Sequence, residues 1–93
     1  MTEQRFASVW DAIEDNPVVA ENLKIRSELM MFLRDHIKKK KLTQVQAAKL
    51  FGVTQPRVSD LMRGKISLFA IDTLINMLTA AGLRVKVQVG KAA

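Results

Sequence analysis

The sequence predicts a mainly helical bundle that ends in one short β-strand. Two observations support this fold class. Apolar residues recur every three or four positions through most of the chain, and only residues 83–89 alternate apolar and polar side chains. The 93 residues suffice for one domain. We divide it into an N-terminal short helix or arm (1–17), a helical domain (18–82) and a C-terminal strand with its tail (83–93).

Composition excludes several classes of protein. There is no cysteine and a single histidine, His36, so we expect neither a disulfide nor a metal site. We find no apolar run of membrane-spanning length and no signal peptide, which predicts a cytoplasmic protein without a membrane partner. Because no paired acid and base, nucleophile motif or phosphate-binding glycine loop is present, we expect a non-enzyme that uses no cofactor.

Charge is distributed unevenly along the chain. The formal net charge is +6, but residues 1–36 carry 4 basic and 7 acidic side chains, whereas residues 37–93 carry 11 basic and 2 acidic ones. The first part is therefore net −3 and the second net +9. This asymmetry indicates that the second part faces a polyanion.

The N-terminal segment carries an apolar stripe with helical spacing. Its members are Phe6, Val9, Trp10 and Ile13, at positions i, i+3, i+4 and i+7. Asn16-Pro17 then breaks the pattern. The stripe has two interpretations: it packs on the core as a lid with Trp10 at its centre, or it is a contact surface for a partner protein.

The longest helix is expected over residues 18–40. Leu23, Met30, Leu33 and Ile37 share one face of it. Lysines gather at its C-terminal end, where the helix dipole favours positive charge. Because Lys38, Lys39, Lys40 and Lys41 immediately precede the next motif, we expect them to contact phosphates.

Residues 42–63 predict two short helices joined by a tight turn. Thr43 and Gln46 have capping-box spacing at the start of the first helix, and Gly52 suits the left-handed residue that ends it. Thr54 is a second N-cap candidate, and Pro56 falls in the first turn of the second helix. Apolar residues should pack the helices together: Val45, Ala48 and Leu50 of the first helix face Val53, Val58 and Leu61 of the turn and the second helix.

This pair of helices is a helix-turn-helix, and it resembles the Xre/Cro-type repressor family over roughly residues 29–82. The shared motifs are Leu42-Thr43-Gln44, Ala48, Gly52, Val53-Thr54-Gln55, Val58-Ser59 and Arg63-Gly64-Lys65. The resemblance implies a Cro/repressor-like helical bundle that represses transcription. Lys41 departs from the family's usual glycine, but lysine can adopt positive φ at a cost of roughly 1 kcal/mol.

The second helix of the motif, about Gln55–Arg63, would enter the DNA major groove with its N-terminal part leading. The expected base-reading residues are Gln55, Pro56, Ser59 and Asp60. The expected contacts to the DNA backbone are Lys38, Lys39, Lys40, Lys41, Thr43, Gln44, Thr54, Arg57, Arg63 and Lys65.

A last helix should follow the motif, with Ser67 as its cap and Gly82 as its stop signal. Beyond Gly82 lies the expected strand, which has no obvious mate in its own chain. Pairing with a second copy would bury its apolar side and give a homodimer on a palindromic operator, with a swap of N-terminal helices as the competing arrangement. The expected interface residues are Leu83, Val85, Val87 and Val89.

Within the family, the chain resembles the subgroup of HigA-like antitoxins. The motifs that carry this resemblance are Val9–Ile13, Gln55–Ser59, Phe69 and Gly82–Val85. It implies a repressor of a toxin–antitoxin operon that also neutralises a RelE/HigB-like toxin, with the contact through Phe6, Val9, Trp10 and Ile13. The alternative is a stand-alone phage-type repressor without a toxin partner.

Overall fold

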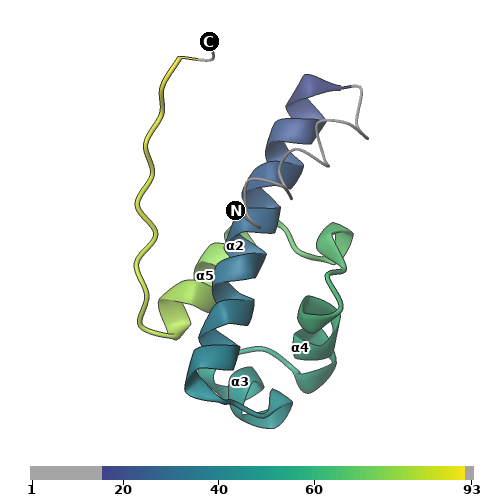
Figure 1. The fold of residues 1–93 in the computed structure, drawn as a ribbon, viewed down its shortest axis with the longest axis vertical. Helices are drawn as coiled ribbons and strands as arrows, with labels where there is room; N and C mark the ends of the chain where they lie inside the picture. Colours follow the sequence, from purple (N-terminus) through teal and green to yellow (C-terminus); the bar gives the residue numbers. More distant parts are fainter. Residues whose placement is uncertain (1–15, 92–93) are drawn as a thin grey trace.

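The computed structural model describes residues 16–91, in which four α-helices and one 3-10 helix surround a single core (Figure 1). In chain order they are α2 (Pro17–Lys40), α3 (Gln44–Phe51), α4 (Gln55–Met62), η1 (Ile66–Leu68) and α5 (Ile71–Ala80). The long helix α2 packs against α5, η1 and α4, while α3 packs against α4 and α5. The expected N-terminal helix with Phe6, Val9, Trp10 and Ile13 lies outside the described residues.

Local signals set both ends of α2. The side chain of Asn16 accepts a hydrogen bond from the backbone N–H of Val18 at 2.9 Å, and Pro17 occupies the first turn, where its missing N–H costs little. The Asn16-Pro17 break is therefore the start of the helix. At the other end Lys41 adopts φ 52° and ψ 46°, and the next N–H, of Leu42, donates to the Ile37 carbonyl at 3.0 Å. The left-handed lysine expected at this position is confirmed.

The turn between α3 and α4 also follows the sequence. Thr43 and Gln46 form the complete capping box: the Gln46 N–H donates to Thr43 Oγ1 at 3.1 Å, and the Thr43 N–H donates to Gln46 Oε1 at 2.9 Å. Gly52 ends α3 with φ 71°. Thr54 is the N-cap of α4 by position, but its side chain makes no capping hydrogen bond.

The core joins α2 to the helix-turn-helix and to α5. Its most completely buried side chains include Leu33 from α2, Val58 and Leu61 from α4, and Leu74 from α5. The expected contribution of Val45 is wrong, because this side chain is 50% exposed. The buried residues of α3 are Ala47, Ala48 and Phe51, which lie on the side of the helix facing both α4 and α5.

The segment between α4 and α5 differs from the expected helix cap. Ser67 lies inside η1 and does not cap α5, which instead begins after Ala70 without a side-chain cap. Between them Phe69 is extended, at φ −124° and ψ 105°, and its side chain is fully buried. This extended conformation places the phenyl ring in the core.

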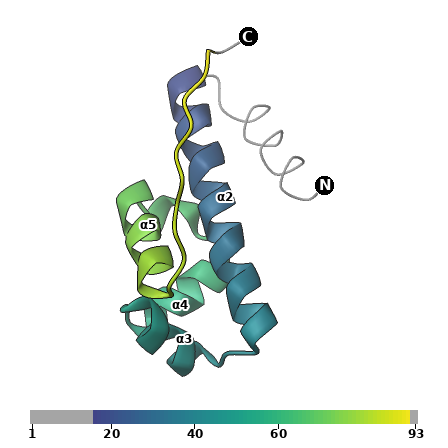
Figure 2. The same ribbon diagram turned by 90° about the vertical axis from the view of Figure 1, so that its left-hand side faces the viewer.

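The expected C-terminal β-strand is wrong. Residues 83–91 are extended, but no part of the chain from residue 16 to residue 91 forms a β-strand. Figures 1 and 2 show this segment passing along α5 and α2, and no other extended segment of the described residues lies beside it. A strand needs a neighbour to take its backbone hydrogen bonds, so the alternating pattern by itself produces an extended chain and not a sheet.

Candidate nucleic-acid interface

Helix α4 has one buried face and one polar face. Its buried residues, Val58 and Leu61, are held in the core. A step of about 100° per residue places Ser59 and Arg63 on the side away from them, with Gln55 at the edge of that side, roughly 60° from Val58. The same geometry gives Pro56 and Asp60 to this polar face. The structure thus brings together the four residues expected to read bases.

Within α4 itself, exposure on this face decreases from the N-terminal end, and Arg63, just after the helix, is exposed again. Gln55 and Pro56, in the first turn of α4, are exposed, and so is the preceding Thr54. Ser59 and Asp60, one turn further on, are half-buried. The N-terminal end of α4 is therefore the part of the helix that a large partner can reach most easily.

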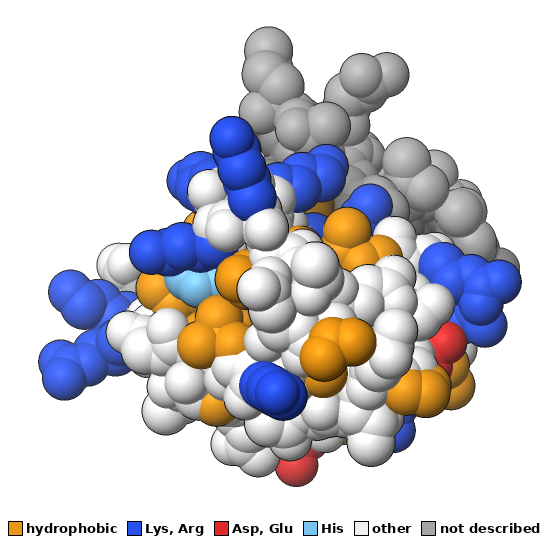
Figure 3. Space-filling view, turned by 90° about the horizontal axis from the view of Figure 1, so that it is seen from below, with side chains coloured by type: hydrophobic (Ala, Val, Ile, Leu, Met, Phe, Trp, Pro, Cys, Tyr) orange, Lys and Arg blue, Asp and Glu red, His pale blue; other side chains and the backbone are white. Residues whose placement is uncertain are grey.

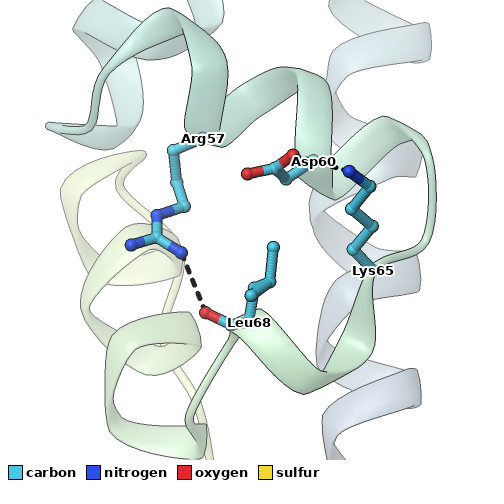
Figure 4. Close-up of polar contacts among 4 residues, drawn as sticks. All are labelled: Arg57, Asp60, Lys65 and Leu68. Atoms are coloured by element: carbon cyan, nitrogen blue, oxygen red, sulfur yellow. Dashed lines mark hydrogen bonds and ion pairs between the residues drawn. The ribbon is translucent and has the colours of Figure 1, made fainter.

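Asp60 is held by a cation of the following turn. The Lys65 ammonium lies 3.6 Å from Asp60 Oδ1 (Figure 4), and the Lys65 backbone N–H donates to the Asp60 carbonyl at 3.1 Å. Gly64 permits this tight return of the chain with φ 72°. The carboxylate and the ammonium offset each other's charge, which reduces the repulsion that an acid on this face exerts on a polyanion.

Arg57 points away from the polar face. Its Nη1 donates to the Leu68 carbonyl at 2.9 Å (Figure 4), and its guanidinium lies 5.3 Å from the centre of the Phe69 ring. On the helix Arg57 lies only roughly 40° from the buried Leu61, which explains its inward direction. No pattern in the sequence indicates this contact, because Leu68 is eleven residues away.

The remaining expected DNA-backbone residues surround this helix pair. Lys38, Lys39 and Lys40 form the exposed last turn of α2, and Lys41 follows as its cap. At the start of α3 the capping Thr43 and the neighbouring Gln44 are also exposed, as are Arg63 and Lys65 after α4. Figure 3 shows this end of the molecule, with Lys and Arg side chains around a mostly uncharged centre and little acidic surface. This end therefore presents a basic surface next to the polar face of α4.

A separate apolar surface lies on another side of α2. A groove of about 650 Å³ runs between α2, α5 and the C-terminal segment, lined by residues that include Ile25, Phe32, Ile75, Val85 and Val87. Phe32 is 53% exposed and Val87 79% exposed. Of the four expected dimer-interface residues, Val85 packs partly on the core, whereas Leu83, Val87 and Val89 remain exposed.

A polar recognition face on the second of two short helices, beside a basic surface, defines a DNA-binding protein of the helix-turn-helix class. Residues 12–90 match the family model described as a helix-turn-helix domain. A solved structure described as an XRE-family transcriptional regulator superposes with a TM-score of 0.73 at 30% sequence identity, covering 78% of this chain and 82% of the other. The comparison with curated proteins gives no match. The chain belongs to the XRE family of helix-turn-helix transcriptional regulators.

Two further findings concern metal ligands and membrane spans. Across residues 16–91, no group of three or more His, Cys, Asp or Glu side chains is placed to hold a metal ion. Over the same range, no helix combines the length and the apolar character needed to cross a membrane.

Proposed function

We propose that this regulator is a sequence-specific repressor that reads its operator with the N-terminal end of α4. The observation that carries the proposal is the exposure of Gln55 at the start of a helix flanked by cations. The Gln55 amide pairs with N6 and N7 of adenine in the major groove. Pro56 packs on a thymine methyl group, and Ser59 donates or accepts at the next base edge.

The contacts to the DNA backbone fix the register of the helix on the duplex. Exposed donors at the helix ends supply them: Lys38, Lys39, Lys40, Lys41, Thr43, Gln44, Thr54, Arg63 and Lys65. If the ion pair between Asp60 and Lys65 breaks on DNA, the Asp60 carboxylate accepts a hydrogen bond from a cytosine N4 amino group. If the ion pair is kept, Asp60 holds the Lys65 ammonium in place.

Selection of bound duplexes from a random library tests this function. We expect an inverted-repeat site in which Gln55→Ala relaxes preference at one base pair per half-site and costs about 1–3 kcal/mol of specific binding. Arg63→Ala is the matched control: it should weaken all duplexes alike and leave the selected sequence unchanged. Selection of no consensus, or an identical consensus for Gln55→Ala, would refute base reading by this residue.

The repressor acts as a homodimer on a palindromic operator. One helix-turn-helix reads few base pairs, and two-fold pairing places two recognition helices about 34 Å apart on successive turns of the groove. The apolar groove supports this pairing, since Val87 in its lining is 79% exposed and Val89, just beyond it, is 89% exposed. A second copy would cover them, together with Leu83 and Val85.

Sedimentation of Val87→Asp tests the interface. We expect a monomer that keeps its helical circular dichroism and loses cooperative operator binding. Val18→Asp is the matched control, because Val18 is 78% exposed but lies outside the groove. A Val87→Asp protein that remains dimeric would move the interface elsewhere, with a swap of N-terminal segments as the next candidate.

The regulator also neutralises a RelE/HigB-like toxin as a HigA-like antitoxin. The acidic character of residues 1–15 and the apolar stripe of Phe6, Val9, Trp10 and Ile13 support a contact with a small basic protein. The first check is the neighbouring gene, which should encode such a toxin. Co-expression with that toxin should then give a complex that Phe6→Ala with Trp10→Ala weakens while operator affinity is kept. Without such a gene, the protein is a stand-alone phage-type repressor.

A further inference from the structure

We propose that Arg57 is a positioning residue, which sets the angle of α4 on DNA by tying the first turn of this helix to the Leu68-Phe69 segment. The proposal rests on the proposed operator binding by α4. It gives Arg57 a role in discriminating among sequences that a phosphate contact would not have.

Two contacts hold the guanidinium in place. Arg57 Nη1 donates to the Leu68 carbonyl at 2.9 Å, and the guanidinium carbon lies 5.3 Å from the centre of the Phe69 ring. Phe69 is fully buried, so its ring is a fixed support for the guanidinium. The planar guanidinium can stack on a ring and donate a hydrogen bond at its edge at the same time.

Helix α4 needs such a tie because it is short. It has eight residues, below the length at which helices are stable without packing. Its C-terminal end is held by the return of the chain, in which the Gly64 N–H donates to the Leu61 carbonyl and the Lys65 N–H to the Asp60 carbonyl. Arg57 secures the opposite end through its hydrogen bond to the Leu68 carbonyl (Figure 4). It follows Gln55 by two residues in the sequence. Residues 64–69, which follow α4, therefore hold both ends of this helix.

These contacts also compete with a phosphate contact. A guanidinium that turned outward to a phosphate would lose both its hydrogen bond to the Leu68 carbonyl and its contact with the Phe69 ring. Arg57 therefore contributes to binding through the orientation of Gln55, and its removal should affect the operator more than random DNA. A phosphate contact would weaken both kinds of DNA equally.

The test is a double-mutant cycle in operator affinity with Arg57→Ala, Phe69→Leu and the double variant, measured at a temperature where circular dichroism shows all of them folded. We expect Arg57→Ala to lower operator affinity about tenfold, to spare random duplex, and to leave the slope of log K against log salt unchanged. The two effects should be non-additive by a factor of about three or more, because both substitutions break one contact.

Arg63→Ala is the matched control for a phosphate contact: its salt slope should fall by about 0.9 for each phosphate that the variant no longer neutralises. Arg57→Lys keeps the positive charge but loses the planar guanidinium, and it replaces the cycle as the test if Phe69→Leu does not fold. We expect it to lower operator affinity about threefold or more.

A reduced salt slope with equal weakening on both DNAs would overturn the proposal in favour of a phosphate contact. Additive effects in the cycle, or unchanged operator affinity, would overturn it as well. Failure of the wild-type protein to prefer any duplex would instead refute the proposed operator binding itself.

Discussion

The turn between α3 and α4 allows a direct measurement of what a left-handed residue costs in this fold. Gly52 has φ 71°, and a Cβ added there would meet no atom within 4 Å. Gly52→Ala therefore introduces backbone strain without a steric clash. The same conformation occurs at Lys41, with φ 52°, but there a residue with a side chain already carries the strain.

The magnitude follows from two opposing effects. A left-handed conformation costs a residue with a Cβ about 1–2 kcal/mol. Replacing glycine also lowers the conformational entropy of the unfolded chain, which raises the free energy of unfolding by about 0.4–1 kcal/mol. We expect Gly52→Ala to lower the free energy of unfolding by about 1 kcal/mol, which lowers the Tm by about 4–8 °C for a domain of this size. Lys41→Gly should raise the free energy of unfolding by a similar or smaller amount.

Urea unfolding followed by circular dichroism measures both changes, with the m-value unchanged. Lys40→Gly is the matched control, because it removes the same charge one residue earlier, inside the last turn of α2. It should destabilise by up to about 1 kcal/mol, the opposite sign to Lys41→Gly. If Lys41→Gly destabilises as Lys40→Gly does, or if Gly52→Ala is neutral, the strain argument is wrong.

Three further predictions concern the cap, the core and the lysines. Thr43→Ala removes the capping box and should cost about 1 kcal/mol in urea unfolding, whereas Thr43→Ser should keep most of the stability; equal destabilisation would mean that the hydroxyl does not matter. Leu33→Ala leaves a cavity at a fully buried position and should lower the free energy of unfolding by about 2–5 kcal/mol, measured in the same assay. Replacing Lys38, Lys39 and Lys40 by Gln should lower the salt slope of DNA binding by about 0.9 for each phosphate left without its lysine, and an unchanged slope would exclude their phosphate role.

The sequence determined the features whose partners lie within one helical turn or one tight turn. The capping box joins Thr43 to Gln46, three residues apart, and Lys41 and Gly52 each end a helix through bonds to its own last carbonyls. The Asn16-Pro17 start of α2 is equally local. Such contacts can be read from spacing, because the chain connecting the two groups leaves few other geometries. The polar face of α4 followed from helical periodicity in the same way.

The tertiary structure decided what depends on distant neighbours. Ala47 and Phe51 are buried in place of Val45, because α3 faces α5 as well as α4. Arg57 turns to Leu68 and Phe69, eleven and twelve residues away, although its spacing alone allowed an outward phosphate contact. Residues 83–89 alternate as a strand does, yet within residues 16–91 they find no neighbour to pair with and stay merely extended. A β-sheet, the contact of Arg57 with Leu68 and Phe69, and the buried face of α3 each need a second segment that is distant in sequence. A local sequence pattern describes only one of the two segments.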